Sequence, residues 1–170
     1  MKNQRPQREE HAAYYNHVID LAEGKNIIQV LKTTHIETLD LLNQIDEKTW
    51  DYRYTSDKWS VGEVLQHIVD CERVFAYRAL SISKGDQTPL PGFDQDLWVK
   101  ATPMTGKQND FLEDLIAVRQ STISLFQSFN EDQLLQKGIA SNNPLSVRSI
   151  GFIIAGHERH HIQVIKERYL

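Results

Sequence analysis

The chain has 170 residues, of which 40% are hydrophobic and 25% charged, with a formal net charge of −4. This length is enough for one domain with a proper core, and the composition is typical of a water-soluble protein. Because acidic and basic residues are interspersed, the sequence lacks the basic surface on which nucleic-acid binding depends, and we expect no nucleic-acid partner.

The cysteine content and the apolar runs indicate the compartment. A single cysteine, Cys71, excludes an internal disulfide framework and is typical of a reducing environment. Residues 1–6 are polar and carry no apolar signal core. The apolar runs are far shorter than the roughly 20 residues that span a bilayer. We therefore expect a cytoplasmic protein with no membrane partner.

The first two predicted helices have the apolar periodicity of amphipathic helices. The first covers about residues 26–44. The second covers residues 60–85, and its start is sharp, because Ser60 and Glu63 match the two ends of a capping box. The pattern predicts Ser60 as the N-cap of this helix.

Two further helices follow in the second half of the chain. The third is expected over residues 105–129, with a second capping-box pattern at Thr105 and Gln108. The fourth is expected over residues 146–169. There is no convincing alternation of period two, no repeat and no low-complexity segment. The sequence therefore predicts an all-α protein, most simply a four-helix bundle.

The connection between the second and third helices is unusually long. Residues 84–104 contain three prolines and two glycines and do not form a tight hairpin. The length suits a crossover along the bundle, which leaves helices two and three parallel. Within it, residues 90–94 either cover one end of a site or belong to a plain surface crossover.

The last helix carries two histidines, His157 and His161, in an HxxxH pattern. Their spacing places both imidazoles on one face of the helix, near the centre of its apolar stripe, with His160 at the edge of that stripe. One buried histidine is usually satisfied by a hydrogen bond, but two in adjacent turns are costly without partners. The pair therefore favours a metal site.

A third candidate ligand, His67, lies in the second helix. It is about 10 Å from the start of that helix and His161 is about 12 Å from the end of the last one, so antiparallel packing brings them to similar depth. The alternative is a flanking histidine that pairs with Glu63 or faces solvent. Cys71 is one turn further on, and we expect it to be a small buried hydrophobe rather than a ligand.

Two of these segments resemble motifs of the DinB superfamily. Residues 58–70, KWSVGEVLQHIVD, are similar to the second-helix signature of that family, and residues 156–161, GHERHH, are similar to its last-helix motif. Residues 72–78 and 89–93 are also similar to one branch of the family. The resemblance covers roughly residues 25–170, which leaves residues 1–24 as an N-terminal extension.

The resemblance implies a four-helix bundle of up-down-down-up order with a divalent metal, zinc or nickel, held by His67, His157 and His161. It implies a metal-dependent hydrolase or thiol-S-transferase that acts on a small molecule, with a low-molecular-weight thiol as one possible substrate, and a homodimer. Two other functions stay open. One is a bundle that binds metal and a small ligand without turnover, and the other is a structural bundle whose histidines satisfy one another.

Several polar residues near the histidines are candidates for supporting roles. Glu158, Glu63 and His160 are candidates for general acid–base catalysis. Glu158 is expected to support a ligand or to be solvated, and Glu63 to be engaged in the capping box. Arg73 and Arg78 either hold an anionic group of a substrate or form salt bridges with neighbouring carboxylates.

Overall fold

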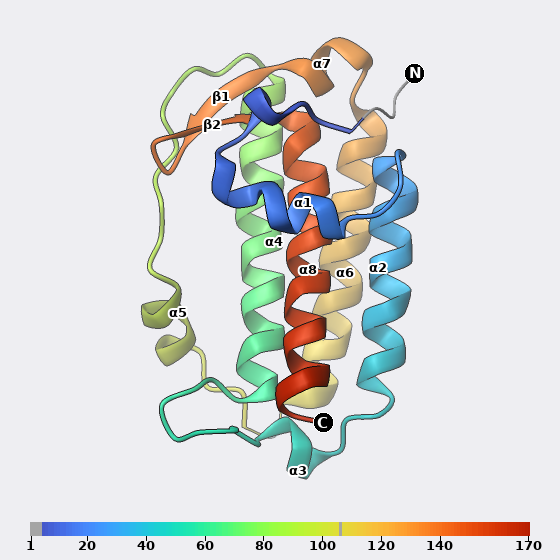
Figure 1. Ribbon diagram of the computed structural model, residues 1–170, viewed down its shortest axis with the longest axis vertical. Coiled ribbons are helices and arrows are strands. Elements are labelled where there is room, and N and C mark those ends of the chain that lie inside the picture. Colours follow the sequence, from blue (N-terminus) through green and yellow to red (C-terminus); the bar gives the residue numbers. More distant parts are fainter. Residues whose placement is uncertain (1–4, 106) are drawn as a thin grey trace.

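The computed structural model describes residues 5–105 and 107–170, and four long helices pack side by side in it (Figure 1). They are α2 (Ile27–Leu42), α4 (Val61–Ser83), α6 (Gln108–Ser128) and α8 (Val147–Arg168). In Figure 1, α2 and α8 run downward, whereas α4 and α6 run upward. The predicted all-helical class and the four-helix bundle are confirmed.

The helix starts differ in how well the sequence predicted them. At α4 the Ser60 hydroxyl accepts a hydrogen bond from the Glu63 N–H, and the Glu63 carboxylate accepts one from the Ser60 N–H, so the predicted capping box is confirmed. The capping box predicted at Thr105 and Gln108 is wrong. Helix α6 begins only at Gln108 and has no side-chain cap, because its N-cap is Lys107, whose side chain has no hydrogen-bond acceptor; the Gln108 amide donates to the Ile45 carbonyl.

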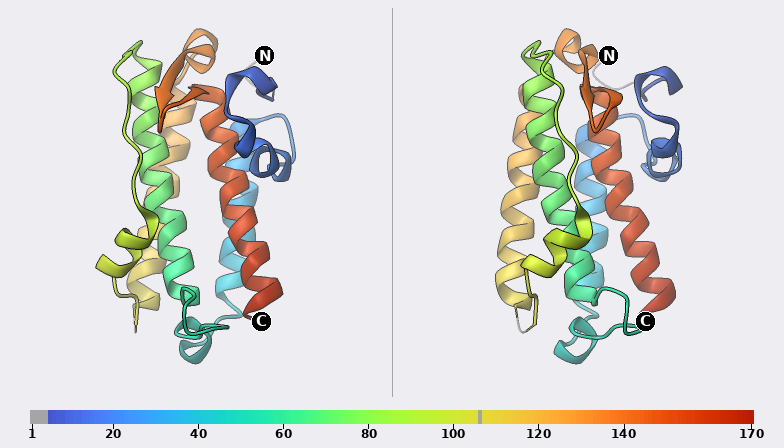
Figure 2. Two further views of the ribbon diagram at one scale, coloured as in Figure 1. Left: turned by 60° about the vertical axis from the view of Figure 1, so that its left-hand side comes forward. Right: turned by 90° about the vertical axis from the view of Figure 1, so that its left-hand side faces the viewer.

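The long connection between α4 and α6 runs back along the outside of α4 (Figures 1 and 2) and carries a short helix, α5 (Gln95–Ala101). Its first part lies against a hairpin of two four-residue strands, β1 (Lys137–Ala140) and β2 (Asn143–Ser146). The Leu90 N–H donates to the Ile139 carbonyl, and Ser141 N–H donates to the Leu90 carbonyl. The hairpin, which the sequence did not predict, therefore anchors the crossover.

Short elements complete the fold: η1 (Arg8–Glu10), η2 (Ala13–Tyr15), α1 (Asn16–Leu21), α3 (Glu47–Trp50) and α7 (Glu131–Leu135). Of the expected N-terminal extension, residues 1–4 lie outside the described part, and residues 5–24 pack across α8. A Cβ added to Gly156 of α8 would lie 1.6 Å from the Val18 carbonyl oxygen of α1. Only glycine allows α1 to approach α8 this closely.

The core has an apolar cluster toward each end of the bundle and a charged layer between them. One cluster includes Phe75 and Phe152, and the other includes Trp50 and Leu65. The charged layer consists of Arg119, Glu72 and Glu158, which are at most 2% exposed. Arg119 reaches Glu72 through two hydrogen bonds of 2.8 and 2.7 Å and Glu158 through one of 2.9 Å. The layer therefore joins α4, α6 and α8.

Arg119 is also tied to the fourth long helix. Its Nη1 donates to the Leu31 carbonyl at 2.7 Å and to the Thr34 hydroxyl at 3.1 Å, and Thr38 donates to Glu158 at 2.7 Å. All four long helices thus meet at one guanidinium. In the described part of the chain, no helix is long and apolar enough to cross a membrane.

Candidate metal centre

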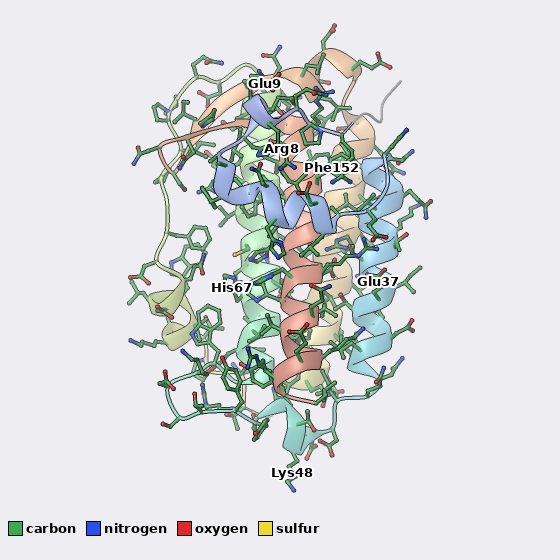
Figure 3. The ribbon with its side chains drawn as sticks, in the orientation of Figure 1. Arg8, Glu9, Glu37, Lys48, His67 and Phe152 are labelled. Carbon is green, nitrogen blue, oxygen red and sulfur yellow. The ribbon has the colours of Figure 1, made fainter. Side chains whose placement is uncertain are left out.

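The three predicted ligands meet where α4 faces α8. The Nε2 atom of His157 lies 3.2 Å from Nε2 of His67 and 3.1 Å from Nε2 of His161. The ring centroids of His67 and His161 are 4.9 Å apart. Figure 3 shows His67 at this helix–helix boundary. The structure therefore brings together two histidines from one helix and one from another, as the sequence predicted.

A second layer covers the cluster on the side of α4. The Trp59 ring, just before α4, lies 5.0 Å from the His67 ring, centroid to centroid. The Trp59 indole donates to the Asp96 carboxylate of α5 at 3.1 Å. The crossover therefore supplies part of the cover, and His67 is only 4% exposed.

Burial keeps the three imidazoles neutral. It lowers the pKa of His67 to about 4, although the negative charge of Asp96 acts in the opposite direction. Burial, together with the neighbouring histidines, lowers the pKa of His161 to about 3. The same causes hold the pKa of His157 well below its usual range. Neutral imidazole is the form that binds metal ions.

The donor set, and two of the three spacings between its nitrogens, fit a divalent metal ion. Metal–nitrogen bonds of ~2.0–2.1 Å in a tetrahedral site separate neighbouring ligand atoms by about 3.3 Å. The two Nε2–Nε2 distances at His157, 3.1 and 3.2 Å, are close to this value. Without a metal, one N–H on His157 can satisfy only one of its two neighbours. Among the described residues, the three whose donor atoms all lie within 4.8 Å of one another are His67, Cys71 and His157, whereas His161 is brought close to His157.

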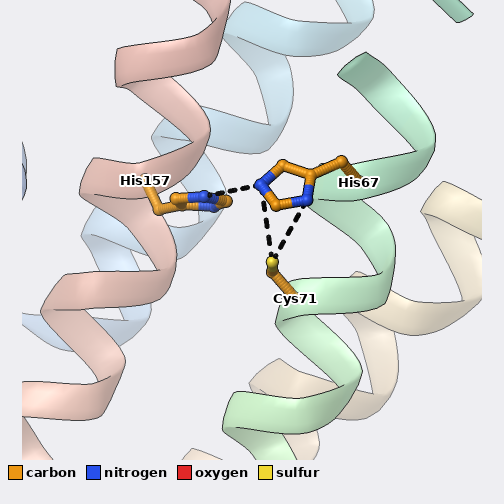
Figure 4. A group of neighbouring side chains, drawn as sticks. All are labelled: His67, Cys71 and His157. Atoms are coloured by element: carbon orange, nitrogen blue, oxygen red, sulfur yellow. Dashed lines mark hydrogen bonds between the residues drawn. The ribbon is translucent and has the colours of Figure 1, made fainter. Parts of the chain in front are cut away.

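The structure adds Cys71 to the candidate donors (Figure 4). Its Sγ lies 3.6 Å from both ring nitrogens of His67, and donor atoms of Cys71, His67 and His157 all lie within 4.8 Å of one another. Burial raises the pKa of the thiol to about 12. The residue is buried, as expected for a small hydrophobe, but it is also next to the centre. In the sequence, its position one turn after His67 was the feature that could have indicated this proximity.

The three candidates for general acid–base catalysis are either engaged by other side chains or lie at the edge of the histidine cluster. Glu158 is completely buried and bound by Arg119 and Thr38, so of its two alternatives the solvated carboxylate is wrong, because this face of α8 packs into the core. Glu63 is engaged in the capping box and by Arg53, as expected. The ring of His160 is 5.1 Å from that of His161 and remains at the edge of the cluster.

The two arginines of α4 differ from one another. Arg73 pairs with Asp70 and Asp114, so the salt-bridge interpretation is confirmed for this residue. Arg78 has no carboxylate partner in the described part of the chain. It donates instead to the Pro91 carbonyl at 2.7 Å and to the Ser141 hydroxyl at 3.0 Å, since the crossover and the hairpin both reach it.

Fold and site together define a four-helix bundle with a candidate histidine metal centre between two antiparallel helices. A family model for the DinB superfamily matches residues 31–165, and the chain belongs to that superfamily. No match was found among curated protein sequences.

Two solved structures from Bacillus subtilis are similar to the chain. YfiT, described as a probable metal-dependent hydrolase with an unusual four-helix bundle topology, has 15% sequence identity and a TM-score of 0.70, over 96% of this chain and 91% of YfiT. The DinB-like protein YjoA has 16% identity and a TM-score of 0.60, over 84% of this chain and 89% of YjoA. At these identities the likeness establishes the fold.

Proposed function

We propose that the protein is a metal-dependent hydrolase of a small molecule, with zinc or nickel bound by His67, His157 and His161. The observation that carries the proposal is the meeting of three neutral imidazoles at the α4–α8 interface, with His67 buried and His157 and His161 partly buried. The description of YfiT as a probable metal-dependent hydrolase supports the reaction class.

Each part of the site has a distinct task in this proposal. A divalent ion held by three neutral imidazoles would retain its full charge, lower the pKa of a water molecule and polarise a carbonyl group. Trp59 packs against His67 and restricts solvent on that side. Asp96 holds the Trp59 indole and places a negative charge beside the cluster. The buried Cys71 thiol stays protonated unless it coordinates the metal as a thiolate.

Metal content tests the centre directly. Protein purified without chelator or nickel resin is analysed by elemental mass spectrometry, together with His67→Ala, His157→Ala and His161→Ala. We expect near-stoichiometric zinc or nickel in the unmodified protein and its loss in each variant, with the helical circular dichroism retained. His35→Ala is the matched control, because His35 lies in α2 outside the cluster, and it should keep the metal.

The reaction class needs a separate measurement. Hydrolysis of a panel of esters and amides should disappear with a chelator and return when zinc or nickel is added. Absence of metal in the unmodified protein, with no uptake of either ion, would overturn the proposal. Bound metal with thiol transfer as the sole activity would replace the hydrolase by a transferase, and bound metal without turnover would leave a binding protein.

A further inference from the structure

A pocket lies between the crossover and α4, the helix that also carries His67, and none of the candidate metal ligands lines it. Its volume is about 600 Å³, within the range of ~300–1,000 Å³ that is usual for small-molecule sites. Three aromatic residues, Tyr77, Phe93 and Trp98, contribute to its largely apolar wall. The rings of Phe93 and Trp98 stack at 4.5 Å, centroid to centroid. Such a wall suits a flat apolar ligand.

One buried positive charge faces this apolar pocket. Arg78 is 2% exposed, and its guanidinium lies over the rings of Phe75 and Phe93, at 5.3 and 5.9 Å from their centroids. Both of its protein hydrogen bonds, to Pro91 and Ser141, come from Nη2. The Nε and Nη1 atoms have no partner within the described residues, and neither is sealed from solvent. The free donors are therefore available to the pocket.

The lack of a counter-charge sets Arg78 apart from the other arginines with little exposed surface. Arg119 pairs with two glutamates, Arg148 with Glu10, and Arg159 with Glu37. Burial of a charge without a partner is unfavourable, and aromatic faces compensate for only part of that cost. An anionic ligand in the pocket would supply the missing partner.

The pocket and the metal centre share one side of α4 and one cover. At 100° per residue, Val74 and Arg78 lie within about 20° of the direction of His67. The Cα atom of Arg78 is about 16 Å further along the helix, and a long helical side chain leans back toward the helix N-terminus, where His67 lies. Helix α5 covers both places, with Asp96 beside His67 and Trp98 in the pocket wall.

We propose that this pocket binds an aromatic carboxylate that carries an ester or amide bond, and that this molecule is the substrate of the metal centre. The inference rests on the proposed function. In the reaction, water cleaves the acyl C–O or C–N bond and yields a carboxylic acid and an alcohol or amine. Arg78 binds the carboxylate that does not react, through a charge-assisted hydrogen bond from Nε or Nη1, the two guanidinium nitrogens that make no hydrogen bond to the described part of the chain.

A carboxylate fits this pocket better than a phosphate. The single uncompensated charge of Arg78 matches a monoanion. The second arginine in the wall, Arg73, is already engaged by two aspartates. One of them, Asp70, also lines the pocket, and a phosphate dianion would face that carboxyl group with only one free arginine.

Binding is measured by isothermal titration calorimetry with phenylacetate and indole-3-acetate, on metal-loaded and on metal-depleted protein. Neutral phenylacetamide tests the need for the charge, and inorganic phosphate tests the class of anion. We expect saturable binding of both carboxylates and at least tenfold weaker binding of the amide and of phosphate. Arg78→Met should weaken carboxylate binding at least tenfold. Arg73→Met, a change of the same type in the same wall, should change it less than threefold.

A second variant covers the case in which Arg78→Met fails to fold. Val74→Phe fills the pocket and leaves the Arg78 guanidinium in place, and it should abolish carboxylate binding while circular dichroism stays unchanged. Unaltered affinity in Val74→Phe, equal affinity for phenylacetate and phenylacetamide, or no saturable binding would overturn the inference. Absence of metal with retained, Arg78-dependent binding would instead remove the proposed function and leave a carboxylate-binding pocket.

Discussion

Replacement of Arg119 by methionine tests the energetic role of the buried charged layer. Methionine has a similar length and fills most of the space, so the change removes mainly the charge and the donors. The guanidinium makes five hydrogen bonds, three of them to the carboxylates of Glu72 and Glu158. Without it, both carboxylates stay buried and have no cation within hydrogen-bonding distance.

The expected loss is large relative to the total stability. Removal of one partner from a buried ion pair usually costs ~3–5 kcal/mol, because the other charge is left uncompensated. A domain of this size has a free energy of unfolding of about 5–15 kcal/mol, and 1 kcal/mol shifts Tm by about 2–4 °C. We therefore expect Arg119→Met to lower Tm by roughly 6–20 °C.

Urea unfolding followed by circular dichroism at 222 nm, together with a thermal melt, measures the change. Arg73→Met is the matched control: its ion pairs are at the surface, with 45% of the side chain exposed, and should contribute less than about 1 kcal/mol. Adding Glu158→Gln to Arg119→Met should recover part of the loss, because one uncompensated charge disappears. Equal losses in Arg119→Met and Arg73→Met would refute the reasoning.

Two further predictions concern the hairpin turn and the histidines. Asn142→Gly should raise Tm by a few degrees, because Asn142 has φ of 62° and glycine adopts this conformation without strain. The control Asn109→Gly lies in helix α6, where glycine is unfavourable, and should lower Tm. In metal-free protein, His67 and His161 have folded-state pKa values of about 4 and 3, below the ordinary 6.5, so the unfolded state binds more protons. Their contribution to the free energy of unfolding is present above pH 6.5 and is lost as the pH falls toward 4, and the loss at pH 5 is about 2 kcal/mol per histidine. Urea unfolding that gives the same free energy at pH 7 and pH 5 would contradict this prediction.

The sequence predicted the parts of the fold that depend on local patterns. Apolar periodicity identified all four long helices, and the Ser60–Glu63 capping box identified the start of α4. The same pattern failed at Thr105 and Gln108, because α6 begins at Gln108 with Lys107 as its N-cap and the Gln108 side chain makes a tertiary hydrogen bond with Ile45. The hairpin was missed because its turn places Ser141 and Asn142, rather than glycines, at positive φ.

The candidate site was predictable only in part from local rules. The HxxxH spacing places His157 and His161 on one face of a helix, whereas the choice of His67 depended on antiparallel packing of two distant helices and on the family resemblance. The position of Glu158 depended on a partner, Arg119, that is 39 residues away in the sequence. A helical wheel shows that Glu158 points away from the metal site, but it does not show which residues of the neighbouring helices contact it.

The position of the histidines in the chain has a consequence for protein synthesis. His67 is translated 90 residues before His157, and α8 is the last of the four long helices to leave the ribosome. Without α8, His67 lacks both of its histidine neighbours, and Arg119 lacks one of its two carboxylates. If the proposed metal binds, its uptake and completion of the charged layer both require α8, so that uptake of the ion would report that the nascent bundle has closed.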